Sequence, residues 1–212
     1  MKFLILLSLL SSNLYASTVL FVGDSHSVGP FGWALDQNMR DAGHEVATYA
    51  SCGSIPKWWT TGQKTTCGFY SRDLKGIKTT LNSAPTPIMN TLLADVKPDI
   101  VVIEFGGNYL KTPSADYITK DIKAFVKKVK DTGARCMWIT QPDSRANRAE
   151  IPRVLKLIKE AVGNDCPIFD STKVTSYPAG GDGTHYWSAA GTPIAKKWAK
   201  AAFDFFTTEL SP

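Results

Sequence analysis

Apolar residues follow two patterns along this chain, and the two patterns alternate. Continuous apolar runs of strand length occur five times, at residues 18–22, 45–49, 100–104, 136–140 and 168–170. Such runs are typical of parallel strands buried on both faces of a sheet. Strands that alternate with helices form layered structures with right-handed crossovers, so the sequence predicts an α/β domain.

Between the expected strands, apolar residues recur at the spacing of amphipathic helices. Gly133 and Gly163 follow two of these segments, where a left-handed residue commonly ends a helix. The segment 51–84 breaks the alternation, because it is rich in Gly, Thr, Ser and Lys without a sustained period. We expect it to be a loop. The three apolar stripes are Ile118, Ile122, Phe125, Val126 and Val129; Val154, Leu157, Ile158, Ala161 and Val162; and Ile194, Trp198, Ala201, Ala202 and Phe205.

The beginning of the chain has the pattern of a secretory signal peptide. Met1 and Lys2 precede the apolar run 3–10, and Leu14-Tyr15-Ala16 supplies a cleavage site. The sequence therefore predicts a signal peptide over 1–16, a single domain over 17–212, and a periplasmic or secreted protein. The apolar run is too short to span a bilayer, so we expect no stable membrane insertion.

The chain contains four cysteines, and none has the spacing of a zinc site. In an exported protein this favours disulfides, for which three pairings exist. We favour Cys52–Cys67, which closes a short loop, together with Cys136–Cys166. Cys136 begins the fourth expected strand and Cys166 precedes the fifth, so both lie at the amino edge of the sheet. If these strands are neighbours about 4.8 Å apart, a disulfide can join the two residues.

Polar residues with catalytic chemistry follow four of the five expected strands. Ser25 comes after the first strand, Gly53 after the second and Asn108 after the third, whereas Asp182 and His185 follow the fifth. In an open parallel sheet, ligands bind at the carboxyl ends of the strands, where these residues converge. A serine hydroxyl needs a base, and a histidine oriented by a carboxylate provides one.

Four ordered sequence blocks carry a resemblance that spans nearly the whole mature chain. They are Gly23-Asp24-Ser25-His26-Ser27, Ser51-Cys52-Gly53-Ser54, Gly106-Gly107-Asn108 and Asp182-Gly183-Thr184-His185. Their order resembles that of the SGNH (GDSL-type) hydrolases, whose blocks supply Ser, Gly, Asn and His. The resemblance implies a three-layer flavodoxin-like fold with a five-stranded, mostly parallel sheet and helices on both faces.

The same resemblance assigns roles to particular residues. It implies a catalytic triad of Ser25, Asp182 and His185. It also implies an oxyanion hole formed by the N–H groups of Ser25 and Gly53 and the side-chain amide of Asn108. An ordinary strand-to-helix turn is the alternative for Gly-Asp-Ser by itself, and the other blocks argue against it.

Three positions depart from the family pattern or leave alternatives open. Tyr109 follows Asn108 where the family usually has Asp, and a register onto Ser54 competes with Gly53. His26 either packs locally or contacts substrate. Its Gly-Asp-Ser-His context resembles SGNH domains that handle O-acyl groups on bacterial polysaccharides. Tyr109 and Trp187, among the aromatic residues of the same loops, are expected to border the substrate.

These features predict an exported serine esterase that removes O-acetyl or other short acyl groups from a cell-envelope or extracellular carbohydrate. The alternatives are a lipase or thioesterase, an O-acyltransferase of the same fold, and a catalytically silent carbohydrate-binding domain. The net charge of +5 suits either a solvated basic face or an anionic surface. We expect no nucleic-acid partner, no metal and no cofactor, because the corresponding motifs are missing. The oligomeric state stays open.

Overall fold

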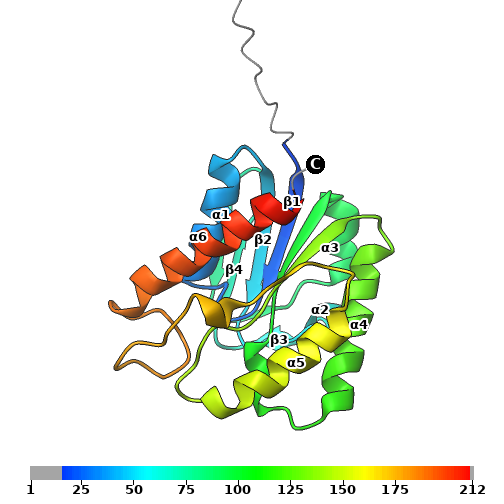
Figure 1. Cartoon of the computed structure of the whole chain (residues 1–212). Coiled ribbons are helices and arrows are strands. Elements are labelled where there is room, and N and C mark those ends of the chain that lie inside the picture. The colour runs from blue at the N-terminus through cyan, green and yellow to red at the C-terminus, as the bar shows by residue number, and fades with distance from the viewer. Residues whose placement is uncertain (1–15, 211–212) are drawn as a thin grey trace, which may run out of the picture.

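The structure, a computed structural model, describes residues 16–210. Its centre is a sheet with the strand order β5-β4-β2-β1-β7-β8-β9 (Figure 1). All five strands expected from the sequence are present and run parallel to one another. They are β1 (Thr18–Gly23), β2 (Glu45–Ser51), β7 (Ile100–Glu104), β8 (Arg135–Ile139) and β9 (Ile168–Phe169).

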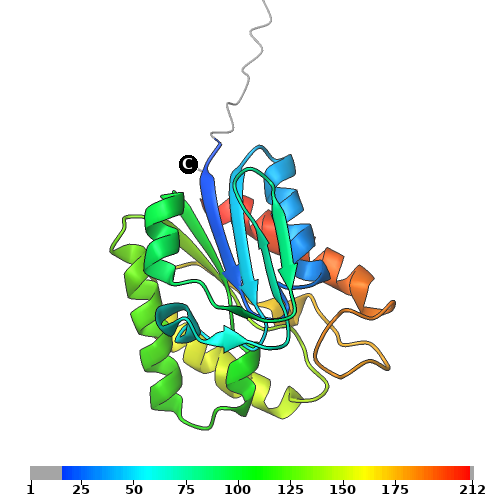
Figure 2. The same ribbon diagram turned by 180° about the vertical axis from the view of Figure 1, so that it is seen from behind.

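The sheet has seven strands rather than the expected five. The additional pair, β4 (Phe69–Arg72) and β5 (Lys78–Leu81), comes from the segment expected to be a loop and lies antiparallel beside β2 (Figure 2). Every residue of β5 is exposed, so no apolar alternation marks it as a strand. The same segment contributes a small ladder of β3 (Lys64–Thr65) and β6 (Ala84–Pro85).

Helices cover both faces of the sheet, which gives the expected three layers. On one face lie α1 (Pro30–Asp41) and α6 (Gly191–Leu210). On the other lie α3 (Met89–Val96), α4 (Ala115–Lys130) and α5 (Ile151–Val162), with the short α2 (Trp58–Thr61) beside them (Figure 1).

The helix predictions hold in detail for α4 and α5, whereas only Trp198 and Ala202 of the stripe expected in α6 are fully buried. The apolar stripes of α4 and α5 are buried against the sheet, because the helical period places them on one face. Gly133 and Gly163 follow these helices with φ of +81° and +57°. A left-handed residue at this position is favourable mainly for glycine, which has no Cβ to clash.

Both expected disulfides are present. Cys52–Cys67 joins the end of β2 to the chain just before β4. Cys136–Cys166 has a Cα–Cα distance of 5.0 Å and lies two residues before the register pair of Trp138 and Ile168. The strands are therefore neighbours at the amino edge, as the sequence argument required.

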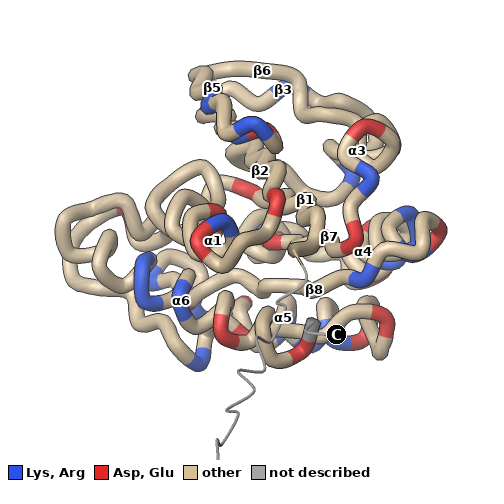
Figure 3. Tube along the Cα trace, turned by 90° about the horizontal axis from the view of Figure 1, so that it is seen from above, with Lys and Arg blue, Asp and Glu red and all other residues tan. Residues whose placement is uncertain are grey.

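The predicted signal peptide falls almost entirely on residues 1–15, which lie outside the described residues, so it stays a prediction. Between residues 16 and 210, no helix has the length and apolarity needed to cross a membrane. Basic and acidic positions lie interspersed along helices such as α1 and α4 (Figure 3).

Candidate active site

Three catalytic groups expected from the sequence meet at the carboxyl edge of the sheet. His185 Nε2 lies 2.9 Å from Ser25 Oγ, and His185 Nδ1 lies 2.5 Å from Asp182 Oδ2. Ser25 belongs to the turn after β1, whereas the other two residues belong to the loop between β9 and α6. This is the linear hydroxyl–imidazole–carboxylate arrangement of a serine nucleophile with its general base.

The turn that carries Ser25 is set by its neighbours. The Ser27 N–H donates to the Asp24 carbonyl, and the His26 N–H donates to Asp24 Oδ1 at 3.0 Å. Gly23 is required at the end of β1, because a Cβ there would lie 2.1 Å from Ser27 Oγ. The chain can therefore fold back on itself at once and present Ser25 at the strand end.

The Asp182 carboxylate is fixed by several donors. The N–H groups of Thr184 and His185 both donate to Asp182 Oδ1 at 2.8 Å. The Tyr177 hydroxyl also accepts from the Gly183 N–H and donates to Asp182 Oδ1, which stabilises this loop. Burial raises the pKa of Asp182, but the hydrogen bonds from the His185 ring and these N–H groups outweigh it and keep the pKa below its usual range. The carboxylate is thus ionised at neutral pH and ready to stabilise an imidazolium.

Trp187 lies against His185. Its ring stacks on His185 with a centroid distance of 4.3 Å and an interplanar angle of 20°. The indole edge reaches Gly29, where a Cβ would lie 2.2 Å from Trp187 Nε1. Trp187 stays 43% exposed, so it borders the solvent-facing side of the site.

His26 is buried next to the triad. Its ring centroid lies 5.6 Å from that of His185 and 5.7 Å from that of Trp198. Burial, followed by the charge of His185, lowers the pKa of His26 to about 3. The side chain is neutral at physiological pH, and its contacts favour packing over direct acid–base chemistry.

Two backbone N–H groups that follow β1 and β2 have no protein acceptor in the described part of the chain. Within residues 16–210, neither the Ser25 N–H nor the Gly53 N–H donates to another protein atom. Gly53 has a φ of +80°, a conformation that favours glycine. The competing register is disfavoured, because the Ser54 N–H is already bonded to the Ser51 carbonyl.

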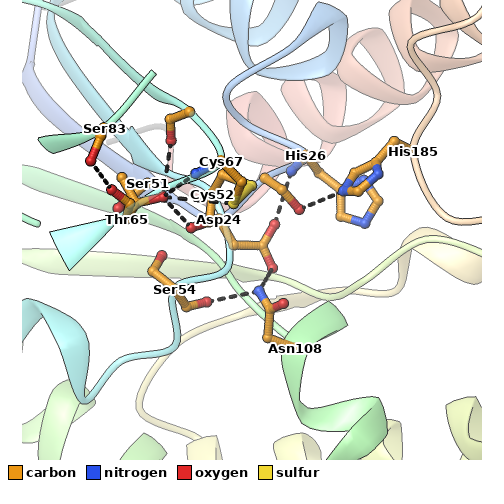
Figure 4. The surroundings of a disulfide bond; sticks show 12 residues. Asp24, His26, Ser51, Cys52, Ser54, Thr65, Cys67, Ser83, Asn108 and His185 are labelled. Carbon is orange, nitrogen blue, oxygen red and sulfur yellow. Dashed lines mark hydrogen bonds between the residues drawn. A yellow bond between two sulfur atoms is a disulfide. The ribbon is translucent and has the colours of Figure 1, made fainter. Parts of the chain in front are cut away.

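Asn108 connects three of the four sequence blocks. Its Nδ2 donates to the Ser54 carbonyl at 2.9 Å and to Asp24 Oδ2 at 3.2 Å (Figure 4). Both amide hydrogens are therefore engaged with the protein. To serve an oxyanion, the amide must exchange its bond to the Ser54 carbonyl for one to the substrate.

Tyr109 does not border the site, contrary to the expectation from sequence. Its side chain is fully buried, and its hydroxyl donates to Asp121 Oδ2 at 2.6 Å. The expectation assumed an extended loop after Asn108. Instead a 3-10 helix, Gly107–Lys111, begins there and turns this ring into the core.

The structure adds residues that sequence reasoning did not single out. Tyr177 holds the loop of Asp182 and His185, because its hydroxyl accepts from the Gly183 N–H and donates to Asp182 Oδ1. Glu104, at the end of β7, is fully buried near Ser25. The available signal for Glu104 was a charged residue that closes an apolar strand. In the described part of the chain, no group of three His, Cys, Asp or Glu side chains is arranged to hold a metal ion.

No family model and no curated protein matches this chain. Several solved structures are similar to it in fold. TesA is 18% identical over 91% of this chain and 99% of its own, with a TM-score of 0.62. A G-D-S-L family protein from Desulfitobacterium hafniense DCB-2 is 14% identical over 87% and 98%, with a TM-score of 0.60. A peptidoglycan O-acetylesterase is 11% identical over 91% and 92%, with a TM-score of 0.56. The chain has the fold of the SGNH hydrolases.

Proposed function

We propose that this protein is an ester hydrolase with Ser25 as its nucleophile. The observation that carries the proposal is the hydrogen-bonded line from Ser25 Oγ through His185 to Asp182. His185 Nε2 takes the proton as Ser25 Oγ attacks the ester carbonyl, and Asp182 stabilises the imidazolium. The same histidine then protonates the leaving alcohol, and water hydrolyses the acyl-enzyme by the reverse sequence.

The charge that develops on the carbonyl oxygen needs donors already in place. We assign this role to the N–H groups of Ser25 and Gly53, which have no protein acceptor in the described residues. Asn108 supplies a third donor when its amide exchanges the Ser54 carbonyl for the oxyanion. A silent binding domain would not need a serine, a base and an acid in bonding distance of one another.

For the substrate, we propose a short acyl ester, such as O-acetyl, on a carbohydrate. Trp33 and Trp187 support this reading, being 49% and 43% exposed. Trp187 lies against Gly29, which precedes α1, and Trp33 follows in the first turn of that helix, with its ring 6.0 Å from that of Tyr70. Exposed aromatic faces beside a site mark a binding surface and can stack on sugar rings. The peptidoglycan O-acetylesterase among the structural neighbours adds weight.

We further propose that the protein works outside the cytoplasm, in the periplasm or medium. Its two disulfides support this, because disulfides persist in oxidising compartments. The signal-peptide pattern of residues 1–16 points the same way.

Labelling with a fluorophosphonate probe tests the activity directly. The wild type should be labelled on Ser25 and should hydrolyse p-nitrophenyl acetate, whereas a folded Ser25→Ala protein should do neither. Full turnover by that variant would overturn the nucleophile assignment. Rates on longer acyl chains that exceed the acetyl rate would overturn the short-chain proposal.

The carbohydrate proposal needs a separate comparison. Trp33→Ala should raise KM for an acetylated saccharide several-fold and leave p-nitrophenyl acetate unchanged, because Trp33 does not touch the triad. Tyr117→Ala is the matched control, since Tyr117 is 42% exposed on α4, on the other face of the sheet. Equal effects of the two substitutions would remove the support for a saccharide surface at α1.

A further inference from the structure

Two carboxyl groups are buried together beside the nucleophile. Asp24 precedes Ser25, and Glu104 ends the neighbouring strand β7; both side chains are fully buried. The Asp24 N–H donates to Glu104 Oε2 at 3.4 Å, so the two acidic residues are direct neighbours. No Lys or Arg between residues 16 and 210 forms an ion pair with either one, so no positive side chain neutralises two charges here. Two buried carboxylates this close would repel each other without a counter-charge, so one of the two groups retains a proton.

The donors around the pair are distributed unequally. Asp24 accepts from the His26 N–H at 3.0 Å and from Asn108 Nδ2 at 3.2 Å, one donor on each oxygen (Figure 4). Glu104 Oε2 accepts from Ser27 Oγ at 2.9 Å and, at 3.4 Å, from the Asp24 N–H. Glu104 Oε1 is buried and receives no donor from the described residues.

This distribution places the proton on Glu104. A buried carboxylate oxygen without a donor is costly, whereas a protonated oxygen donates and needs no donor itself. Asp24, with a donor on each oxygen, is the better anion of the two. Burial and then the charge of Asp24 raise the pKa of Glu104 well above its ordinary value. Burial raises the pKa of Asp24 to about 6, against the effect of its N–H donor, so Asp24 is mostly ionised at neutral pH.

We propose that Glu104 is a positioning residue of the active site. As a neutral acid it donates its O–H to the Asp24 carboxylate. That carboxylate in turn holds the His26 N–H in the nucleophile turn and the side-chain amide of Asn108. One proton on Glu104 thereby fixes both the serine turn and the third oxyanion donor. This inference rests on the proposed esterase function.

The arrangement also limits the charge near the reacting atoms. The single negative charge on Asp24 attracts His185 when that ring becomes an imidazolium. A second negative charge on Glu104 would repel both Asp24 and the oxyanion. Raising the pH through the pKa of Glu104 should therefore break the Asp24 network and reduce kcat while the triad itself is intact.

Two substitutions at Glu104 distinguish a role in positioning the catalytic groups from a role in stabilising the fold alone. Glu104→Gln keeps a donor and cannot ionise, whereas Glu104→Leu has similar volume and no donor. The assay is p-nitrophenyl acetate hydrolysis, with kcat expressed per serine titrated by a fluorophosphonate. Asp36→Asn is the control, because Asp36 is an equally buried carboxyl, paired with Arg40 and Arg72 away from the site.

We expect Glu104→Gln to retain most of kcat at neutral pH and to lose the alkaline fall of the wild type. Glu104→Leu should lower kcat about 10- to 100-fold with little change in KM, the scale of a slightly misplaced catalytic group. Asp36→Asn should lower the melting temperature without changing kcat per titrated serine. An unchanged kcat in Glu104→Leu, or an alkaline fall that persists in Glu104→Gln, would overturn the proposal.

Infrared spectroscopy detects the protonation state of the Glu104 carboxyl group independently of enzyme activity. At neutral pH the wild type should show a carboxylic-acid carbonyl band that disappears in Glu104→Gln, and its absence from the wild type would overturn the inference. A wild type that is neither labelled nor active would instead refute the esterase function. The infrared band still decides the protonation state of Glu104 in that case.

Discussion

Replacing Asn108 with alanine should reduce stability and turnover by separate mechanisms. The substitution removes the hydrogen bonds to the Ser54 carbonyl and to Asp24 Oδ2. A neutral hydrogen bond contributes about 1 kcal/mol and one to a charged group about 1.5–3 kcal/mol, so the free energy of unfolding should fall by about 2.5–4 kcal/mol. The loss comes from two buried acceptors that the alanine leaves without a partner.

The loss of turnover follows from the oxyanion. Removing one oxyanion donor typically costs about 10²–10³ in kcat. Here the amide must first give up its 2.9 Å bond to the Ser54 carbonyl, so the net gain is smaller. We expect a loss near the lower end, about 10²-fold in kcat, with KM nearly unchanged because the bond to the oxyanion forms only in the transition state.

Urea denaturation measures the first effect, and kcat per titrated serine on p-nitrophenyl acetate measures the second. Tyr109→Phe is the matched control, because Tyr109 is the next residue along the chain and the substitution removes its part-buried 2.6 Å hydrogen bond to Asp121. It should lower stability by about 1–3 kcal/mol without changing kcat. If Asn108→Ala loses stability but keeps wild-type kcat, Asn108 is only a structural link and the backbone N–H groups form the oxyanion hole alone.

Three further predictions concern the base, the disulfide and pH. Asp182→Asn should lower kcat less than Ser25→Ala does, because Asp182 orients the histidine rather than forming a bond; equal losses would argue against this role. Replacing Cys136 and Cys166 with serine should cost about 3–4 kcal/mol of stability, seen in urea, and leave kcat intact, since the bridge lies at the opposite edge. The free energy of unfolding should fall as pH rises above 4.5 towards the raised pKa of Glu104, because the unfolded chain releases that proton first. Glu104→Gln should remove this fall of up to about 1.4 kcal/mol per pH unit, and an identical slope in both proteins would contradict it.

The parallel strands could be predicted because they are buried on both faces, which requires continuous apolar runs. The antiparallel pair β4 and β5 could not, because β5 is exposed throughout and its pairing depends on β4 rather than on its own composition. The register that joins Cys136 to Cys166 followed from strand order alone. Long-range pairing without a buried face leaves no comparable pattern in the sequence.

The placement of the candidate catalytic residues was predictable for a related reason. Ser25, Asn108, Asp182 and His185 each follow a strand, and parallel strands deliver their carboxyl ends to one edge. Tyr109 was placed wrongly, because the prediction needed the local backbone after Asn108. A 3-10 helix and an extended loop send the next side chain in different directions, and the residues Gly106-Gly107-Asn108 are compatible with both.

Glu104 illustrates what sequence reasoning lacks at such a site. By sequence it is the polar end of an apolar strand, which usually means that the chain is reaching solvent. Its partner Asp24 lies 80 residues earlier along the chain and meets it only because β1 and β7 are neighbours. Burial of both carboxyls then turns an unremarkable pair into one that must retain a proton. The chemical state of these residues therefore depends on strand order and packing together, although the residue types themselves are visible from the start.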